Sequence, residues 1–207
     1  MPPIAEYDAL RADVYRLLAR LIREAPNAEL LEFLAGLEMD DAGELRAYWA
    51  ALALAAANTQ SEPLERAHFR HLIGVIQGDL LPYASWYLTG SLMELPLVEL
   101  RQDLQRLGFE RAASTKEPED HFAAMCEVMA MLIETDPAEQ SHFFQRHLAP
   151  WGLDFMTDLA AVDTPFYASV GQLGRMFLRQ DQHMLEEAGE PVRLIDTVQP
   201  AHQQQRQ

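Results

Sequence analysis

The sequence predicts an all-α protein, built as an irregular bundle of many helices. Apolar residues recur at steps of three and four through most of the chain, which is the spacing of a helix with one buried face. Proline and glycine separate these segments, and no alternating run of β-branched residues indicates a sheet. We expect one helical domain over residues 1–190 and a polar, flexible tail over residues 191–207.

Four helices are predicted in the first part of the chain, over residues 7–23, 29–37, 43–57 and 64–76. Pro26 ends the first helix, and Pro63 suits the first turn of the fourth. The expected buried residues of the first helix are Leu10, Val14, Leu17, Leu18 and Leu21. Those of the fourth helix are Phe69, Leu72, Ile73 and Ile76.

The helical pattern stops between residues 74 and 90, where glycine, proline and three aromatic residues gather in what we interpret as an irregular connector. A helix over residues 97–107 follows, with Gly108 as a left-handed cap. The next helix is predicted to begin near Pro118 and to bury Phe122, Met125, Met129, Leu132 and Ile133. The remaining helices are expected over residues 137–147, 153–161 and 165–188, with a turn at Pro150 and Trp151.

Composition excludes several classes of function. Thirty-two acidic residues against 16 basic ones give a net charge of −16, which disfavours nucleic-acid binding and favours basic partners. The single cysteine, Cys126, lies within an apolar helix, so we expect a core residue and neither a disulfide nor a cysteine-based metal cluster. No segment has the length and hydropathy of a membrane span or of a secretory signal. We expect a cytoplasmic protein without metal, cofactor or catalytic residues.

Three spaced segments carry a resemblance to a known family. They are Pro-Tyr-Ala-Ser-Trp-Tyr-Leu at residues 82–88, Glu-Pro-Glu-Asp-His at residues 117–121, and His-Leu-Ala-Pro-Trp at residues 147–151. In this order and spacing they resemble the TorD/DmsD family of cytoplasmic chaperones for molybdenum-containing oxidoreductases. The resemblance implies an irregular helical bundle of the TorD/DmsD type. It also implies that the protein binds the twin-arginine leader, and the body, of an apo-enzyme until the cofactor has been inserted, and that it is a monomer or a weak homodimer.

The chemistry of such a leader indicates what the site must contain. Two adjacent guanidinium groups next to an apolar stretch require carboxylates beside an apolar or aromatic groove. The acidic pentapeptide and the aromatic connector supply both kinds of group, and we expect them to lie side by side. The candidate leader-binding residues are Pro118, Glu119, Asp120 and His121 in the pentapeptide, Tyr83, Ser85, Trp86 and Tyr87 in the connector, and Leu72 in the preceding helix.

The sequence departs from the family pattern in one segment, and the candidate site residues also have simpler structural interpretations. The family has Tyr-x-x-Leu-Phe before a glycine-rich turn, whereas this chain has Phe-Arg-His-Leu-Ile at residues 69–73, which affects the choice of leader. The pentapeptide also fits an ordinary helix cap with acidic residues in the first turn. If Asp120 and His121 instead pair as recognition residues, the helix terminus disfavours imidazolium and leaves His121 a neutral donor or acceptor. Trp86 is the best candidate among the connector aromatics for a core residue, and Trp151 is expected to be a buried indole after a helix.

Two other classes of protein remain possible. Glu65 with His68, and Glu139 with His142, place a carboxylate and an imidazole three residues apart, as in di-iron helical bundles. Such a bundle needs two further inward glutamates, and the breaks after residue 74 shorten its first helix, so we expect both histidines to be solvated or to cap helices. An acidic helical module that binds another basic partner would share every compositional feature.

Overall fold

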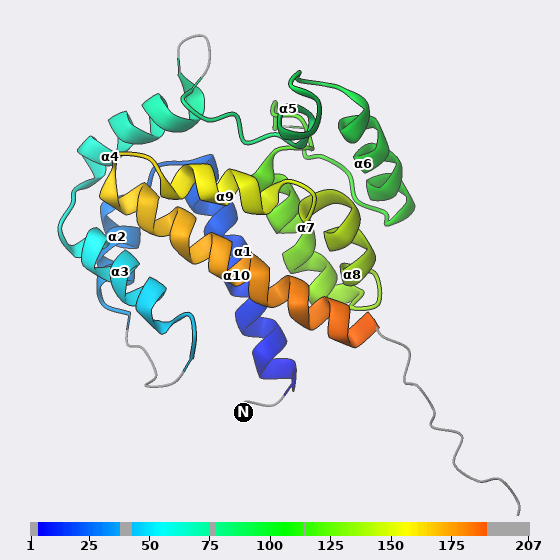
Figure 1. The fold of residues 1–207 in the computed structure, drawn as a ribbon, viewed down its shortest axis with the longest axis horizontal. Helices are drawn as coiled ribbons and strands as arrows, with labels where there is room; N and C mark the ends of the chain where they lie inside the picture. Colours follow the sequence, from blue (N-terminus) through cyan, green and yellow to red (C-terminus); the bar gives the residue numbers. More distant parts are fainter. Residues whose placement is uncertain (1–3, 38–42, 75–77, 114, 190–207) are drawn as a thin grey trace, which may run out of the picture.

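Two helices form the centre of the molecule: α1 (Ile4–Arg23) packs along α7 (Phe122–Thr135). The computed structural model describes residues 4–37, 43–74, 78–113 and 115–189. Helix α10 (Pro165–Gly189) crosses the front of this pair in Figure 1 and packs on α9 (Gly152–Ala160) and on α3 (Arg46–Ala57). The other elements are α2 (Ala28–Ala35), α4 (Ser61–His68), η1 (Phe69–Ile73), α5 (Ala84–Thr89), α6 (Leu95–Arg106), α8 (Gln140–Phe143) and η2 (Phe144–Leu148).

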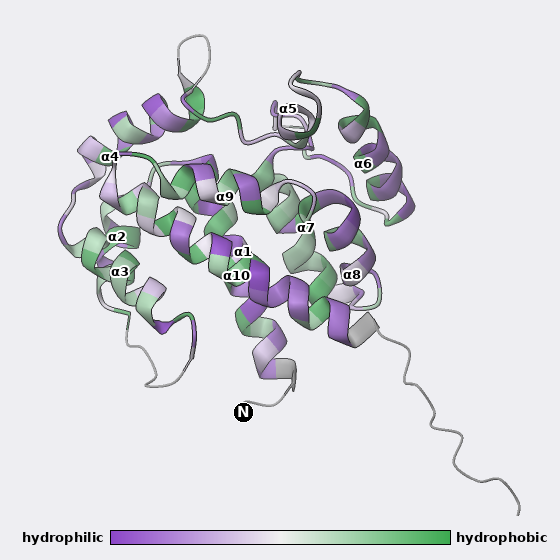
Figure 2. Ribbon diagram, viewed as in Figure 1, coloured by the Kyte–Doolittle hydropathy of each residue, from purple (hydrophilic) through white to green (hydrophobic). Residues whose placement is uncertain are grey.

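The all-α class predicted from the sequence is confirmed. The described residues contain no strand, and their only β-type pairing is an isolated bridge between Tyr83 and His121. Hydrophobic faces turn toward the centre of the bundle in Figure 2. All five residues expected on the inner face of α7 are buried, as are Cys126 and Trp151. None of the described helices has both the length and the apolar character needed to cross a bilayer.

The buried stripe of α1 differs from the prediction. Leu18 and Leu21 are buried as expected, but Leu10 is 56% exposed, and Arg11 and Tyr15 point inward instead. Arg11 Nε donates to Asp181 Oδ1 on α10 at 2.6 Å, and Tyr15 Oη donates to Asp181 Oδ2 at 2.6 Å. An inward arginine is possible here because a carboxylate 170 positions away neutralises it.

The fourth predicted helix changes its winding partway. Regular α4 ends at His68, and the π-helical turn η1 follows. The extra residue per turn shifts the inner face, so His68, His71 and Leu72 are buried while Phe69 and Ile73 are about half exposed. The prediction for Phe69 and Ile73 was therefore wrong, and Ile76 lies outside the described residues. His68 is also not the solvated or capping residue expected, because its Nε2 lies 3.1 Å from the Ile22 carbonyl oxygen in the core.

Other boundaries deviate less. The helix expected from residue 43 begins at Arg46, and the one expected over residues 137–147 is α8 from Gln140 with η2 to Leu148. The connector is not irregular throughout, because residues 84–89 form α5. Gly90 and Gly108 have φ of 77° and 78°, so the left-handed cap expected at Gly108 is confirmed. The predicted tail over residues 191–207 lies outside the described residues.

Candidate functional site

The acidic pentapeptide and the aromatic connector lie side by side, as the sequence predicts. Tyr83 and His121 form an antiparallel bridge. Ala84 N donates to the Asp120 carbonyl oxygen at 2.9 Å, and Phe122 N donates to the Pro82 carbonyl oxygen at 2.8 Å. Backbone groups therefore hold the two segments together, independently of the side chains that they present.

Asp120 is the internal anchor of this junction. Its side chain is buried, with 1% exposure of the residue, and its Oδ2 accepts from Ser85 N at 3.0 Å and from Ser85 Oγ at 2.5 Å. Ser85 Oγ in turn lies 3.3 Å from the donating Glu94 N. One carboxylate thus ties the start of α7, the start of α5 and the residue before α6 to one another.

His121 caps α7 from inside. Its Nδ1 accepts from Ala123 N at 3.1 Å, and its ring meets the Tyr83 ring edge-on, with 5.0 Å between centroids. Burial, with smaller contributions from the charges of Arg23 and His68, lowers the pKa of His121 to about 3. The imidazole is therefore neutral, as expected, although burial rather than the helix terminus is the main cause. Because the cap is His121, Pro118 stands ahead of the helix and not in its first turn, which corrects the prediction.

The pentapeptide at residues 117–121 is here called the acidic tip. Two of its carboxylates lie outside the core: Glu117, with a side chain 42% exposed, and Glu119, with a side chain 14% exposed. Arg101 of α6 donates to Glu119 Oε2 from Nε at 2.9 Å and approaches from Nη2 at 2.8 Å, while Arg111 Nε lies 3.2 Å from Oε1. Partial burial alone would raise the pKa of Glu119, but the Arg101 hydrogen bond and the charges of Arg101 and Arg111 lower it overall. This carboxylate is thus ionised and already shaped around guanidinium groups.

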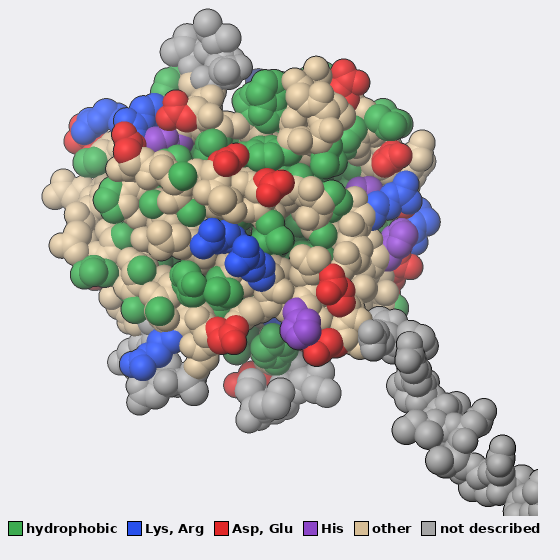
Figure 3. All heavy atoms as spheres, in the orientation of Figure 1, with side chains coloured by type: hydrophobic (Ala, Val, Ile, Leu, Met, Phe, Trp, Pro, Cys, Tyr) green, Lys and Arg blue, Asp and Glu red, His purple; other side chains and the backbone are tan. Residues whose placement is uncertain are grey.

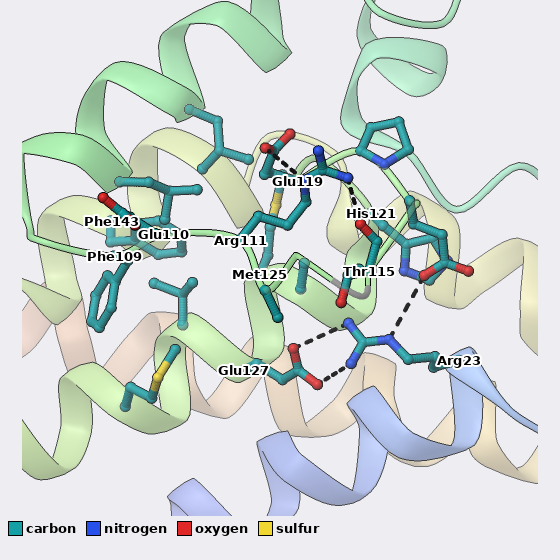
Figure 4. A pocket seen from close by; sticks show the side chains of 18 residues that line it. Arg23, Phe109, Glu110, Arg111, Thr115, Glu119, His121, Met125, Glu127 and Phe143 are labelled. Atoms are coloured by element: carbon teal, nitrogen blue, oxygen red, sulfur yellow. Dashed lines mark hydrogen bonds and ion pairs between the residues drawn. The ribbon is translucent and has the colours of Figure 1, made fainter.

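A pocket of about 250 Å³ opens beside Glu119 and His121 (Figure 4). Its size is below the roughly 300–1,000 Å³ of small-molecule sites and suits one or two side chains of a peptide. Arg23 lies on the opposite rim, where its Nη2 donates to Glu127 at 3.1 Å and its Nε is 3.7 Å from Glu117. The apolar lining residues are Leu100, Leu104, Phe109, Ala112, Pro118, Ala124, Met125, Val128, Met131 and Phe143.

The connector aromatics have different environments. Trp86 is 38% exposed, so the expectation that it is the core residue of the three was wrong. Tyr87 is half-buried, stacks near Trp151 with 5.4 Å between centroids, and donates from Oη to Asp158 Oδ2 at 2.8 Å. Tyr83 is also half-buried, and burial with the charges of Glu117 and Asp120 raises its pKa to about 12. Leu72 is part of the buried core in η1.

Sequence reasoning missed the arginines of the site. Arg101, Arg111 and Arg23 bind the acidic residues, yet each follows the pattern of an ordinary solvated helix or loop residue. Only the excess of acidic over basic residues hints that such arginines are engaged.

The di-iron interpretation gains nothing from the structure. Glu65 and His142 are exposed, and no group of three or more His, Cys, Asp or Glu side chains within the described ranges is arranged to hold a metal.

The chain is similar to a known family and to several known proteins. Residues 38–157 match the family described as nitrate reductase delta subunit. The Tat proofreading chaperone DmsD of Salmonella typhimurium is 33% identical over 130 residues, which are 60% of this chain and 63% of that protein. The chaperone protein TorD of Vibrio cholerae is 31% identical over 121 residues, 52% of this chain and 55% of that protein. Each of these matches therefore spans less than two thirds of the relative's length.

Two further matches extend over more of the chain. The chaperone protein TorD of Shewanella pealeana is 26% identical over 208 aligned positions, covering 86% of this chain and 91% of that protein. The crystal structure of a proposed redox enzyme maturation protein from Archaeoglobus fulgidus has the same fold, with a TM-score of 0.56, 18% identity, and coverage of 82% and 93% of the two chains. Because the family model matches more than half of the sequence, the chain belongs to the nitrate reductase delta subunit family, and its resemblance to the TorD/DmsD chaperones is confirmed.

Proposed function

We propose that this protein is a cytoplasmic chaperone that binds the twin-arginine leader, and the body, of a molybdenum-containing oxidoreductase. It holds the apo-enzyme until cofactor insertion and then releases it for export. Support comes from the family and from relatives whose names describe a Tat proofreading chaperone and chaperone proteins. The proposal assigns the protein no cofactor and no catalytic step, and it allows a monomer or a weak homodimer.

The observation that carries this proposal is the junction of the acidic tip with the aromatic connector. A leader needs a carboxylate for its guanidinium groups and an apolar surface beside that carboxylate. Glu119 offers the first, in a setting that already accommodates two guanidinium groups. The exposed indole of Trp86 and the apolar lining of the pocket offer the second.

The proposed contacts are strong enough for recognition and weak enough for release. A fully exposed ion pair contributes about 0–1 kcal/mol, whereas hydrogen bonds to charged groups in partly buried sites contribute about 1.5–3 kcal/mol. Stacking of guanidinium on an aromatic face adds roughly 0.5–2 kcal/mol. The side chain of Glu119 is only 14% exposed, so its hydrogen bonds belong to the partly buried class. A chaperone that must later release its client requires contacts of this moderate free energy.

The remaining predicted site residues fit supporting roles. Asp120 and Ser85 are buried, so in this conformation they position the connector and the tip rather than face a ligand, whereas the buried His121 also lines the pocket. Leu72 lies in the core, and Pro118 lines the pocket next to Glu119. We infer that loss of any of the three buried polar groups acts on the leader through the geometry of the junction.

The decisive experiment is a titration of a synthetic peptide that carries two adjacent arginines and an apolar stretch. Glu119→Gln keeps the shape of the side chain and removes its charge, so we expect at least a tenfold loss of affinity, about 1.4 kcal/mol, by calorimetry. Glu134→Gln is the matched control, because Glu134 lies on α7, is 46% exposed, and pairs with Arg16. The control variant should bind like the wild type.

A second comparison separates a leader-specific site from a general acidic surface. Replacing both peptide arginines by lysine removes the planar fork but keeps the charge. Equal binding of the two peptides would favour the alternative, a module for any basic partner. Equal affinity of the Glu119→Gln variant and the wild type for the arginine peptide would exclude the tip as the site.

A further inference from the structure

The surface over α5 and the start of α6 is unusually apolar. Within residues 86–98, six large side chains are between 38% and 71% exposed. Figure 3 shows hydrophobic groups exposed in this region, at the upper right of the molecule. The six residues, here called the α5–α6 patch, are Trp86, Leu88, Leu92, Met93, Leu95 and Val98.

The local backbone displays this patch rather than hiding it. Met93 is the most exposed member, at 71%, and has a φ of 60°, which non-glycine residues rarely adopt. On α6, Leu97, Leu100 and Leu104 already fill the buried face. Leu95 and Val98 are one turn apart on the opposite side and have no role in the core. The segment is therefore built with apolar groups facing outward.

The patch leads directly to the acidic tip. Arg101 follows Val98 by three residues on α6 and binds Glu119, so the apolar stripe ends at the carboxylate proposed to receive guanidinium groups. From Leu95 to Arg101 the helix rises about 9 Å. An extended peptide covers that length in about three residues. A single short segment can therefore reach both features.

We propose that the α5–α6 patch binds the apolar segment of the same peptide whose arginines pair with the Glu119 carboxylate. This inference rests on the proposed function and adds the direction of the peptide, which runs along α6 from Arg101 toward Leu95. Entry of the peptide arginines displaces Arg101 from Glu119. The apolar segment begins about three residues away from the arginines.

Charge decides between a peptide and a second copy of this chain as occupant. Glu94 and Glu99 stand beside the patch, and the chain carries a net charge of −16. A symmetric contact would bring these carboxylates of both copies together, and like charges repel. A peptide with basic and apolar parts avoids this repulsion, and its arginines take the places of Arg101 and Arg111 at Glu119.

The test combines protein and peptide variants. The first peptide carries two arginines, about three polar residues, and a run of leucine and alanine; in the second, the leucines are replaced by serine. Leu95→Gln with Val98→Gln should weaken the first peptide at least tenfold and leave the affinity for the second unchanged. The matched control, Phe33→Gln with Leu54→Gln, alters side chains 60% and 67% exposed on α2 and α3 and should change neither. Circular dichroism verifies that each variant is folded.

Each other outcome has a defined meaning. If Glu119→Gln weakens both peptides but the patch variant weakens neither, the patch proposal fails while the proposed function stands. If neither variant weakens either peptide, both fail. If sedimentation shows that the wild type dimerises and the patch variant only dissolves that dimer, the patch is a self-contact and the proposal is wrong. Binding of the leucine peptide to the wild type should change the fluorescence of Trp86, and binding of the serine peptide should not. The change should be absent in the Trp86→Phe variant.

Discussion

Asp120 and His121 shape the site from inside the molecule. Both were expected to face the leader, and both are buried: Asp120 Oδ2 accepts from Ser85, and His121 Nδ1 accepts from the Ala123 amide. Their role in leader binding stays a prediction. In this geometry they act by holding Glu119 and the connector in place. The tip thus combines two buried polar residues that define the junction with two carboxylates, Glu117 and Glu119, that reach solvent.

Neutral His121 should make stability sensitive to acid. The imidazole pKa is about 3 in the folded protein and about 6.5 in the unfolded chain. Between these pH values only the unfolded chain binds the proton, so stability is complete above pH 6.5 and falls as the pH drops toward 3. From pH 7 to pH 5 we expect a loss of about 2 kcal/mol from this group.

The variant His121→Asn isolates that contribution, since asparagine also caps helices but does not titrate. His68 and His147, whose pKa values burial also lowers, remain in the variant and retain part of the acid sensitivity. Urea unfolding at pH 7 and pH 5, followed by circular dichroism, measures the difference. An identical pH-dependent loss in variant and wild type would contradict this account.

At the scale of elements, the positions of the helices follow from the sequence and their registers follow only in part. Proline and glycine mark helix ends, and all five residues predicted for the apolar face of α7 are buried. The errors lie at positions where a contact with a residue distant in the sequence, or a change in helix winding, determines which side chain is buried. Leu10 was expected inside in place of Arg11 because Asp181, far along the chain, does not show in local periodicity. Phe69 was expected inside because a π-turn leaves no clear pattern.

The same limit applies to the candidate site. Neighbouring motifs predicted that the tip and the connector meet, and the bridge between Tyr83 and His121 confirms this. Which side chains face outward was not predictable, because it depends on pairs such as Ser85 with Asp120 and Arg101 with Glu119. These pairs join segments 35 and 18 positions apart, so single-helix periodicity does not contain them.

The junction of α1 with α10 provides an element-scale prediction. Arg11 and Asp181 are 3% and 2% exposed, and Asp181→Ala removes the buried carboxylate that accepts from both Arg11 and Tyr15. We expect a loss of about 2–4 kcal/mol in the free energy of unfolding, because Asp8 still pairs with the guanidinium at 2.8 Å. The double variant Arg11→Met, Asp181→Leu should recover part of it, because neither buried charge remains while the buried Tyr15 hydroxyl still lacks its acceptor. Asp13→Ala, which removes a surface pair on the same helix, is the control. A small effect of Asp181→Ala in urea unfolding would refute the buried-pair account.

For the whole molecule, we expect the net charge to set how fast a basic peptide associates, and local contacts to set how slowly it dissociates. A charge of −16 attracts a basic peptide over distances set by the Debye length, about 30 Å at 0.01 M salt and about 3 Å at 1 M. In the proposed complex, binding depends on Glu119, whose side chain is 14% exposed, and on apolar contacts at the α5–α6 patch, both of which salt screens far less. Association and dissociation should therefore respond differently to ionic strength.

Stopped-flow measurements of the arginine peptide, followed by Trp86 fluorescence, test this separation. Across that salt range we expect the association rate constant to fall at least tenfold, with a much smaller change in the dissociation rate constant. A peptide with citrulline in place of both arginines keeps the shape but loses the charge, so its association should hardly depend on salt. Equal salt dependence of the two peptides would show that the acidic surface does not steer the client, and a dissociation rate that rises as steeply would place the bound arginines in open solvent rather than at the Glu119 tip.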